Sequence, residues 1–207
     1  MTKEELLKVA KPILFNTEMV KAILEGQKTV TRRCVKAKSK NACGFFVTTR
    51  KSDGAFMGVY DYDENEMMYE SPQTQPAYEG DIMYVRETWT KDNYRYMYRA
   101  NYSEIEKFYR DGKEVQLKWK PSIHMPKEAA RIFLKVTDVR VEQLQDMDKM
   151  DALKEGIDNR LCINLSHALT KFKKLWNSTI KKSDIDLYGW DVNPWVWVIE
   201  FERIEVE

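Results

Sequence analysis

The 207-residue sequence is poor in the residues that hold metals and disulfides. It contains three cysteines and two histidines, and no two cysteines form a C-x-x-C pair. An odd cysteine count without paired spacing argues against a disulfide framework and against a zinc site. We therefore expect no metal and no cofactor. This cysteine usage also fits a reducing compartment, so the expected location is the cytoplasm.

Long apolar runs and glycine-rich loops are missing as well. No stretch approaches the roughly 18 apolar residues that a membrane span needs, and residues 1–11 are charged rather than signal-like. The eight glycines form no phosphate-cradling run, and neither an internal repeat nor a βαβ rhythm occurs. We expect a soluble protein without a membrane partner.

Neither sign of charge dominates the chain. Its 34 basic and 33 acidic residues nearly cancel, leaving a net charge of +1. Any nucleic-acid site must then be a local basic patch rather than a strongly cationic surface. The 43% of hydrophobic residues can bury a real core, so residues 1–207 are predicted to form a single domain.

Against this background one stretch concentrates chemistry: Gly26-Gln27-Lys28-Thr29-Val30-Thr31-Arg32-Arg33. Asn16 or Thr17 can cap the helix before it, and Gly26 suits a left-handed helix end. β-branched residues then favour a strand, with Thr29, Thr31 and Arg33 on one face and Val30, Arg32 and Cys34 on the other. A plain turn followed by a solvated basic strand explains the same pattern, so both interpretations stay open.

The rest of the chain indicates many short strands. We predict strands at 13–15, 44–50, 55–61, 66–71, 82–89 and 195–206, and an insertion around 91–120 with strands at 94–100 and 115–119 about a helix at 103–109. A long strand at 131–144 changes phase near Thr137, which predicts a β-bulge or barrel corner. A short helix is expected at 148–155, capped by Asp148 and ended by Gly156. A second, longer amphipathic helix is expected after it and ends at about residue 180. The predicted fold is α+β, a curved or closed β-barrel decorated by short helices.

A second group of polar residues follows the strand at 82–89. Arg86 and Glu87 are adjacent and point to opposite faces, so one of them should face inward and needs a partner there. The segment from Trp119 to Pro126 is predicted to be a rigid loop carrying Ser122 and His124, a candidate pocket wall. A histidine satisfied by backbone groups explains this loop equally well. The aromatics of 91–120 suit either base stacking or ordinary strand packing.

Several motifs resemble one protein family. The run from Ile23 to Arg33 resembles the signature of the ASCH family, small β-barrel domains related to the PUA domains of RNA-binding and RNA-modifying proteins. Gly80-Asp81-Ile82-Met83-Tyr84-Val85-Arg86-Glu87-Thr88-Trp89 resembles the family's central strand, and the tail from Asn193 to Phe201 its closing strand. The segment from Trp119 to Pro126, with Arg131, resembles larger phage-type members. The resemblance spans nearly the whole chain and implies a PUA-like barrel.

The resemblance also implies an activity. In the family members most like enzymes, a Lys, a Thr three residues later and a distant Glu form the catalytic set of an amidohydrolase that deacylates N4-acetylcytidine. Lys28 and Thr31 match the first two positions, and Glu155 is the matching carboxylate. Burial and the nearby arginines would lower the pKa of Lys28, so that a neutral amine can accept a proton. Thr31 would attack or orient water, while Glu155 moves the proton to the leaving amine.

Two other functions remain open. A non-catalytic module would bind RNA or a modified nucleotide in the same cleft, with basic side chains on phosphate and aromatics on the base. An RNA-cleaving activity is the third hypothesis. Either Glu155 or Glu87 is expected to face the cleft, and the pattern carries no signal for an oligomeric state. The expected partner is RNA or a modified nucleoside, and the expected binding residues are Arg32, Arg33, Arg86, Glu87, Trp119, Ser122, His124 and Arg131.

Overall fold

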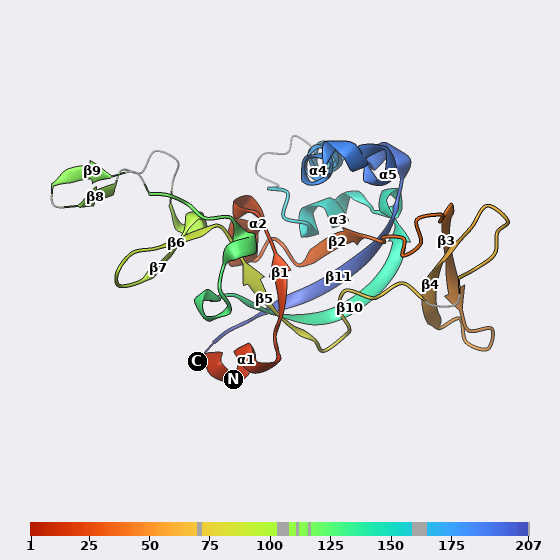
Figure 1. Ribbon diagram of the computed structural model, residues 1–207, viewed down its shortest axis with the longest axis horizontal. Helices are drawn as coiled ribbons and strands as arrows, with labels where there is room; N and C mark the ends of the chain where they lie inside the picture. Colours follow the sequence, from red (N-terminus) through yellow and green to blue (C-terminus); the bar gives the residue numbers. More distant parts are fainter. Residues whose placement is uncertain (70–71, 103–107, 111, 116, 159–164, 207) are drawn as a thin grey trace.

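A five-stranded mixed sheet forms the centre of the molecule. The computed structural model describes residues 1–69, 72–102, 108–110, 112–115, 117–158 and 165–206. In the sheet, β1 (Lys11–Leu14) pairs in parallel with β5 (Ile82–Arg86), and β10 (Phe133–Gln143), β11 (Trp195–Ile204) and β2 (Val30–Cys34) follow in antiparallel order. Figure 1 shows the long, curved β10 and β11 running through the middle.

The sheet is open rather than closed. β1 and β2 are its edges, and no ladder among the described strands joins them into a barrel. The prediction of an α+β fold is confirmed at this level, with a mixed sheet and few helices. The predicted phase slip is confirmed too, because the pairing of β10 with β11 shifts between Val136 and Asp138. Such a bulge increases the local twist of a long strand.

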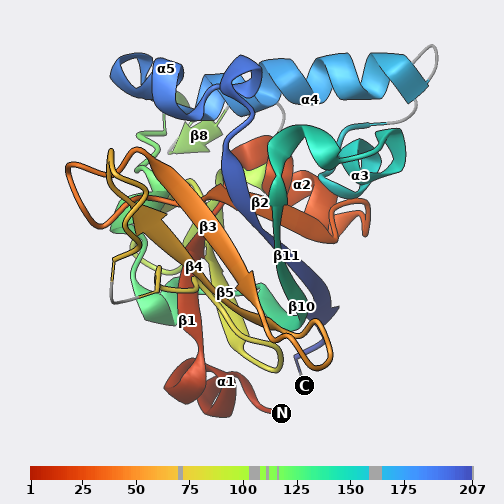
Figure 2. The same cartoon turned by 90° about the vertical axis from the view of Figure 1, so that its right-hand side faces the viewer.

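Helices cover both faces of this sheet. On one face α2 (Thr17–Leu24) shares a core with β5, β10 and β11, which includes Val20, Ile23, Val85 and Leu134. On the other face α3 (Lys149–Lys154) and α4 (Leu165–Thr179) pack on β2 and β11 through a second core. Figure 2 shows α4 and α5 (Ile185–Tyr188) above the sheet, with α3 close below α4. A short α1 (Lys3–Val9) begins with a capping box at Thr2.

Three two-stranded hairpins extend from this centre. They are β3 (Gly44–Thr49) with β4 (Phe56–Tyr62), β6 (Trp89–Lys91) with β7 (Tyr96–Tyr98), and β8 (Phe108–Arg110) with β9 (Lys113–Val115). In Figure 1 the β3–β4 hairpin and the β8–β9 hairpin lie at opposite ends of the molecule. The described chain also contains 3₁₀ turns at Arg99–Asn101, Ser122–His124, Lys127–Ala129, Leu144–Asp146, Lys182–Asp184 and Trp190–Val192.

Four element predictions need correction. The strand expected at 66–71 is only an isolated bridge between Met68 and Tyr62, and residues 70–71 lie outside the described part. The strand expected at 82–89 ends at Arg86, and a separate strand begins at Trp89. The strand expected at 115–119 ends at Val115. The helix expected at 103–109 falls mostly on residues outside the description, and its last two positions belong to β8. No described helix has the length and apolar character of a membrane span.

Candidate active site

Lys28 is buried in the turn between α2 and β2. Gly26 ends the helix with φ +72°, and the amides of Gln27 and Lys28 both donate to the carbonyl of Ala22. The Lys28 side chain is 0% exposed. Its Nζ donates to Val30 O at 2.7 Å, to Glu155 O at 2.9 Å and to Glu155 Oε2 at 2.6 Å. Three acceptors match the three N–H groups of an ammonium.

Glu155 is held at this distance by the end of α3. It is the C-cap residue of that helix, and the amide of Thr29 donates to the carbonyl of Lys154 at 2.9 Å. Gly156 follows with φ +92°, and a Cβ there would lie 2.8 Å from Ala22 Cβ and 3.1 Å from Lys28 Cβ. Only glycine fits both the left-handed backbone and the space. The helix end and the start of β2 are therefore locked together.

Arg32 extends the ion pair into a network. Its side chain is fully buried, and Nη1 donates to Glu155 Oε1 at 3.3 Å. Nη2 donates to Glu142 Oε1 at 2.7 Å and to Asp151 Oδ2 at 3.2 Å. Glu142 in turn accepts from Arg140 on the same strand. Three carboxylates thus occupy the guanidinium that the sequence suggested for substrate, and Arg32 acts as a positioning residue for Glu155.

Electrostatics set Lys28 apart from an ordinary lysine. Burial is the largest cause that lowers the pKa of Lys28 below its ordinary value of 10.5. The positive charges of Arg33 and Arg32 lower this pKa further, whereas Glu155 raises it. The net direction is the one expected from the sequence. An amine with a lowered pKa beside a carboxylate can pass its proton along their shared hydrogen bond.

Thr31 and Glu155 line one small cavity. Its walls also include Met19 of α2 and Phe172, Leu175, Trp176 and Thr179 of α4, and its volume is about 30 Å³. That space holds about two water molecules. Within the described part of the chain the Thr31 hydroxyl has no hydrogen-bond partner, although the residue is only 1% exposed. The hydroxyl is available to a group that enters the cavity.

Arg33 borders the same cavity and has no counter-ion within the described part of the chain. Its Nη1 donates to Arg32 O at 3.2 Å and its Nη2 to Leu14 O at 2.9 Å, while its guanidinium lies 5.4 Å from the Phe15 ring centroid. No carboxylate among the described residues pairs with it. Partial burial lowers the pKa of Arg33, with Glu155 opposing, yet an arginine stays cationic in proteins.

Lys28 and Arg33 also donate hydrogen bonds to the free edge of β2. The carbonyl of Thr29 accepts from β11, so by alternation the carbonyls of Val30 and Arg32 point away from β11. Val30 O accepts from Lys28, and Arg32 O accepts from Arg33. Charged side chains on an edge strand discourage pairing with another chain. The candidate site therefore lies at an edge of the sheet, with Lys28 and Thr31 buried there.

The residues predicted around β5 form a separate cluster. Arg86 donates from Nε to Met125 O at 3.0 Å and from Nη2 to Ile123 O, so it fixes the loop after Trp119. Glu87 is 1% exposed and receives both Nε and Nη2 of Arg131, at 2.8 and 2.9 Å. The prediction that one of the two adjacent charges faces inward with a partner is confirmed. Glu87 is that residue.

The remaining predicted residues take packing or surface positions. Trp119 lies 5.8 Å from the Tyr102 ring centroid and beneath the guanidinium of Arg99 at 5.7 Å. Ser122 and His124 form a 3₁₀ turn in which His124 is exposed. Lys28 is hydrogen-bonded to none of these residues. Glu155, rather than Glu87, is the carboxylate beside Lys28.

Sequence reasoning missed three members of the network. Glu142, Asp151 and Arg140 lie more than 100 positions from Arg32, as the separations of 110 and 119 for its two added partners show. Asp151 had one local signal, because it completes the capping box of α3 with Asp148. That signal gives a helix start and no hint of a buried arginine. For the α4 residues that line the cavity, the sequence showed only an amphipathic helical pattern.

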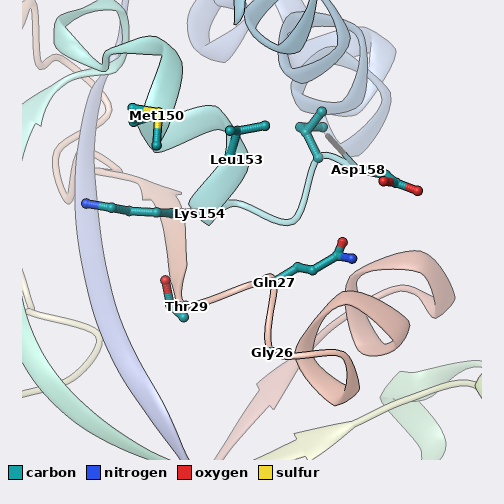
Figure 3. Close-up of a pocket in the computed structure, with 8 residues that line it drawn as sticks. Gly26, Gln27, Thr29, Met150, Leu153, Lys154 and Asp158 are labelled. Carbon is teal, nitrogen blue, oxygen red and sulfur yellow. The ribbon is translucent and has the colours of Figure 1, made fainter. Parts of the chain in front are cut away.

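A larger hollow lies between the α2–β2 turn and the end of α3. Its volume is about 450 Å³, and Figure 3 shows Gln27 extending from the turn toward Leu153 and Asp158. Neither Thr31 nor Glu155 lines it. The lining residues are Gly26, Gln27, Thr29, Met150, Leu153, Lys154, Ile157 and Asp158. This mostly apolar hollow shares no lining residue with the cavity of Thr31.

Neither a metal site nor a match to a known protein identifies the function of this site. Across the described ranges, no group of three or more His, Cys, Asp or Glu side chains is arranged to hold a metal ion. Comparisons of the chain with protein-family models, curated proteins and solved structures find no match. Function is therefore inferred from the geometry and from the motif resemblance.

Proposed function

We propose that the protein is an ASCH-type amidohydrolase with a PUA-like fold, and that it removes an acyl group from the exocyclic N4 of a cytidine. One observation carries this proposal: the buried ion pair of Lys28 with Glu155, whose carboxylate lines the cavity of the Thr31 hydroxyl. These are the three positions that match the family's catalytic set. A buried lysine whose pKa is lowered by burial and which has a specific charge partner beside a cavity is a candidate for a functional role.

The reaction needs a proton relay that returns Lys28 and Glu155 to their starting protonation states. Lys28 gives a proton to Glu155 across 2.6 Å. Its hydrogen bonds all go to Val30 O, Glu155 O and Glu155 Oε2, so the neutral amine has to turn its lone pair from Glu155 toward the cavity before it takes the proton of Thr31, or of a water that Thr31 orients. The oxygen then attacks the acyl carbon, and Arg33 stabilises the developing oxyanion. Glu155 returns its proton to N4 as the carbon–nitrogen bond breaks. Water supplies the oxygen of the released carboxylic acid, directly or by hydrolysing a threonyl ester.

Substrate entry requires the cavity to widen. A volume of about 30 Å³ accepts the acyl group's leading atoms but not a pyrimidine ring. Met19 and the α4 side chains form the wall, and a methionine changes rotamer readily. We expect the base to remain outside the present cavity while its acyl group reaches Thr31.

The test is hydrolysis of N4-acetylcytidine by wild type, Thr31→Val, Lys28→Met and Lys154→Met. Thr31→Val removes the hydroxyl and keeps the shape, while Lys154→Met removes an exposed amine from the same helix end as a control. We expect loss of about 10²-fold or more in kcat for the first two variants and wild-type turnover for Lys154→Met. A wild type without turnover, or a fully active Thr31→Val, contradicts the proposal.

A second candidate is a non-catalytic nucleotide- or RNA-binding module in the same cleft. The unpaired guanidinium of Arg33 favours it, because phosphate is the natural partner of such a group. In that case RNA affinity falls with salt, Arg33→Gln weakens it, and Thr31→Val leaves it unchanged. Salt-series binding to RNA separates this function from hydrolysis.

A further inference from the structure

A third hollow opens at the C-terminal end of β2. Its volume is about 320 Å³, and three of its lining residues are the cations Arg33, Lys36 and Lys38. Arg33 also lines the cavity of Thr31, so the two hollows share this residue. The other lining residues are Cys34, Gln73, Thr74, Pro76 and Trp197. None of the proposed chemistry uses this hollow.

The lining of this hollow is positively charged without compensation. Lys36 is exposed and has no carboxylate partner among the described residues, and Lys38 Nζ donates to the carbonyl of Pro72. Burial raises the pKa of the Cys34 thiol to about 11, so this group is neutral at neutral pH. The loop after β2 contacts the carboxylate of Asp61, a residue of β4. It is buried and accepts the backbone amides of Lys38 and Ser39, each at 2.9 Å.

Asp61 therefore shapes the loop and does not pair with a lysine amine. Three cations converging on one concave surface attract and retain an anion. Guanidinium and ammonium groups together suit the oxygens of a phosphate, and contacts of this kind fix the position of a nucleotide.

Gln73 supplies independent evidence for a ligand. It is 7% exposed, and its Nε2 has no hydrogen-bond partner in the described structure. Its backbone amide bonds to Val59 O at 2.6 Å, which ties this residue to β4. A buried donor without an acceptor costs about 1–3 kcal/mol. A bound anion would provide the missing acceptor.

We propose that this hollow is a phosphate subsite, so that the substrate of the neighbouring cavity is a nucleotide rather than a free nucleoside. Arg33, Lys36 and Lys38 hold the phosphate, and Gln73 donates a hydrogen bond. The acyl group of the base then reaches Thr31, and this placement alone rests on the proposed hydrolase function. The phosphate is either the monoester of a mononucleotide or a phosphodiester of RNA.

The experiment measures binding without turnover, by calorimetry on full-length Thr31→Val protein. The ligands are cytidine, cytidine 5′-monophosphate, inorganic phosphate and a trinucleotide RNA with a central cytidine. We expect the monophosphate to bind at least tenfold more tightly than cytidine, and inorganic phosphate to compete with it. Tighter binding of the trinucleotide assigns the phosphate to RNA, and equal binding assigns it to a mononucleotide.

Two double variants remove the same charge from different places. Lys36→Gln with Lys38→Gln should abolish the preference for the monophosphate, whereas Lys40→Gln with Lys51→Gln, both exposed and outside the hollow, should retain it. Equal affinities for cytidine and its monophosphate overturn the proposal, as does an equal loss in both double variants. Because binding is read without hydrolysis, a protein that discriminates by phosphate yet never deacylates any cytidine refutes only the hydrolase.

Discussion

At the residue scale, the Lys28 amine serves both the stability of the fold and the proposed proton transfer. Its ammonium meets three acceptors, and Glu155 in turn balances Arg32. Removing one partner of a buried ion pair leaves an uncompensated charge, which costs more than the pair contributes. The same arrangement that suits proton transfer therefore also makes the position intolerant.

Lys28→Met is expected to lower the free energy of unfolding by about 3–5 kcal/mol, because Glu155 is left buried without its nearest cation. Thr31→Val should change it by less than about 1.5 kcal/mol, since the hydroxyl has no partner to lose. Urea denaturation followed by tryptophan fluorescence measures both values. Equal stabilities of Lys28→Met and wild type would show that the network does not depend on this amine.

Cys34 gives a prediction for pH. Burial raises the pKa of its thiol from 9.0 to about 11, so the folded protein keeps a proton that the unfolded chain loses earlier. The thiol's contribution to stability is fully present below pH 9.0 and is lost as the pH rises through about 11. Between these values, wild type should lose stability faster than Cys34→Ala.

The matching chemical measurement is alkylation at pH 8, with the modified residue identified by mass spectrometry. Cys43 is exposed and should react first, whereas Cys34 should react slowly because the thiolate is the nucleophile. Rapid labelling of Cys34 at pH 8 would contradict the raised pKa.

At the scale of elements, the junction of α3 with the α2–β2 turn depends on one glycine. A Cβ on Gly156 meets Ala22 and Lys28, whereas a Cβ on Gly26 meets nothing within 4 Å, although both glycines have positive φ. Gly26→Ala should cost about 1–2 kcal/mol from backbone strain alone. Gly156→Ala should cost about 1–3 kcal/mol more through overpacking. Thermal unfolding compares them, and equal effects would mean that the junction adapts.

Helix α4 sets the size of the cavity. Leu175→Ala removes wall atoms beside Thr31 and should raise kcat/KM for N4-acetylcytidine several-fold by admitting more of the substrate. Leu187→Ala, a leucine that is 64% exposed on α5, is the matched control. Steady-state kinetics read both variants. If Leu175→Ala leaves kcat/KM unchanged, the substrate reaches Thr31 by another route.

Local features of the sequence predicted local features of the structure. The caps at Asn16 and Asp148, the left-handed Gly26, the helix end at Gly156 and the bulge beyond Val136 all depend on residues within a few positions of each other. The direct contact of Lys28 with Glu155 was predicted only through the motif resemblance. No pattern of spacing in the chain links two positions so far apart.

The errors have physical causes at longer range. The predicted strand at 66–71 had suitable residues, but apart from the single bridge to Tyr62 it has no partner strand among the described elements. Arg32 looked like a free cation because its partners Glu142 and Asp151 come from β10 and α3. Closure of the sheet depends on whether β1 meets β2, which alternation along single strands does not determine.

At the scale of the whole molecule, the candidate site joins distant parts of the chain. Lys28 and Glu155 are separated by 127 positions, and their contact forms only when the α2–β2 turn and the end of α3 are both in place. Contacts of such long sequence separation carry a large loop-closure cost, so topologies rich in them fold slowly.

This separation has a kinetic consequence. The Lys28–Glu155 contact should be absent from the folding transition state, and mutations there should speed unfolding more than they slow folding. During refolding, any hydrolytic activity should return with the final phase rather than with the first gain of tryptophan signal. Activity that returns early would place this contact in the folding nucleus. If the Lys28–Glu155 contact forms last, the site that includes Lys28 and Thr31 becomes reactive only after the core is complete.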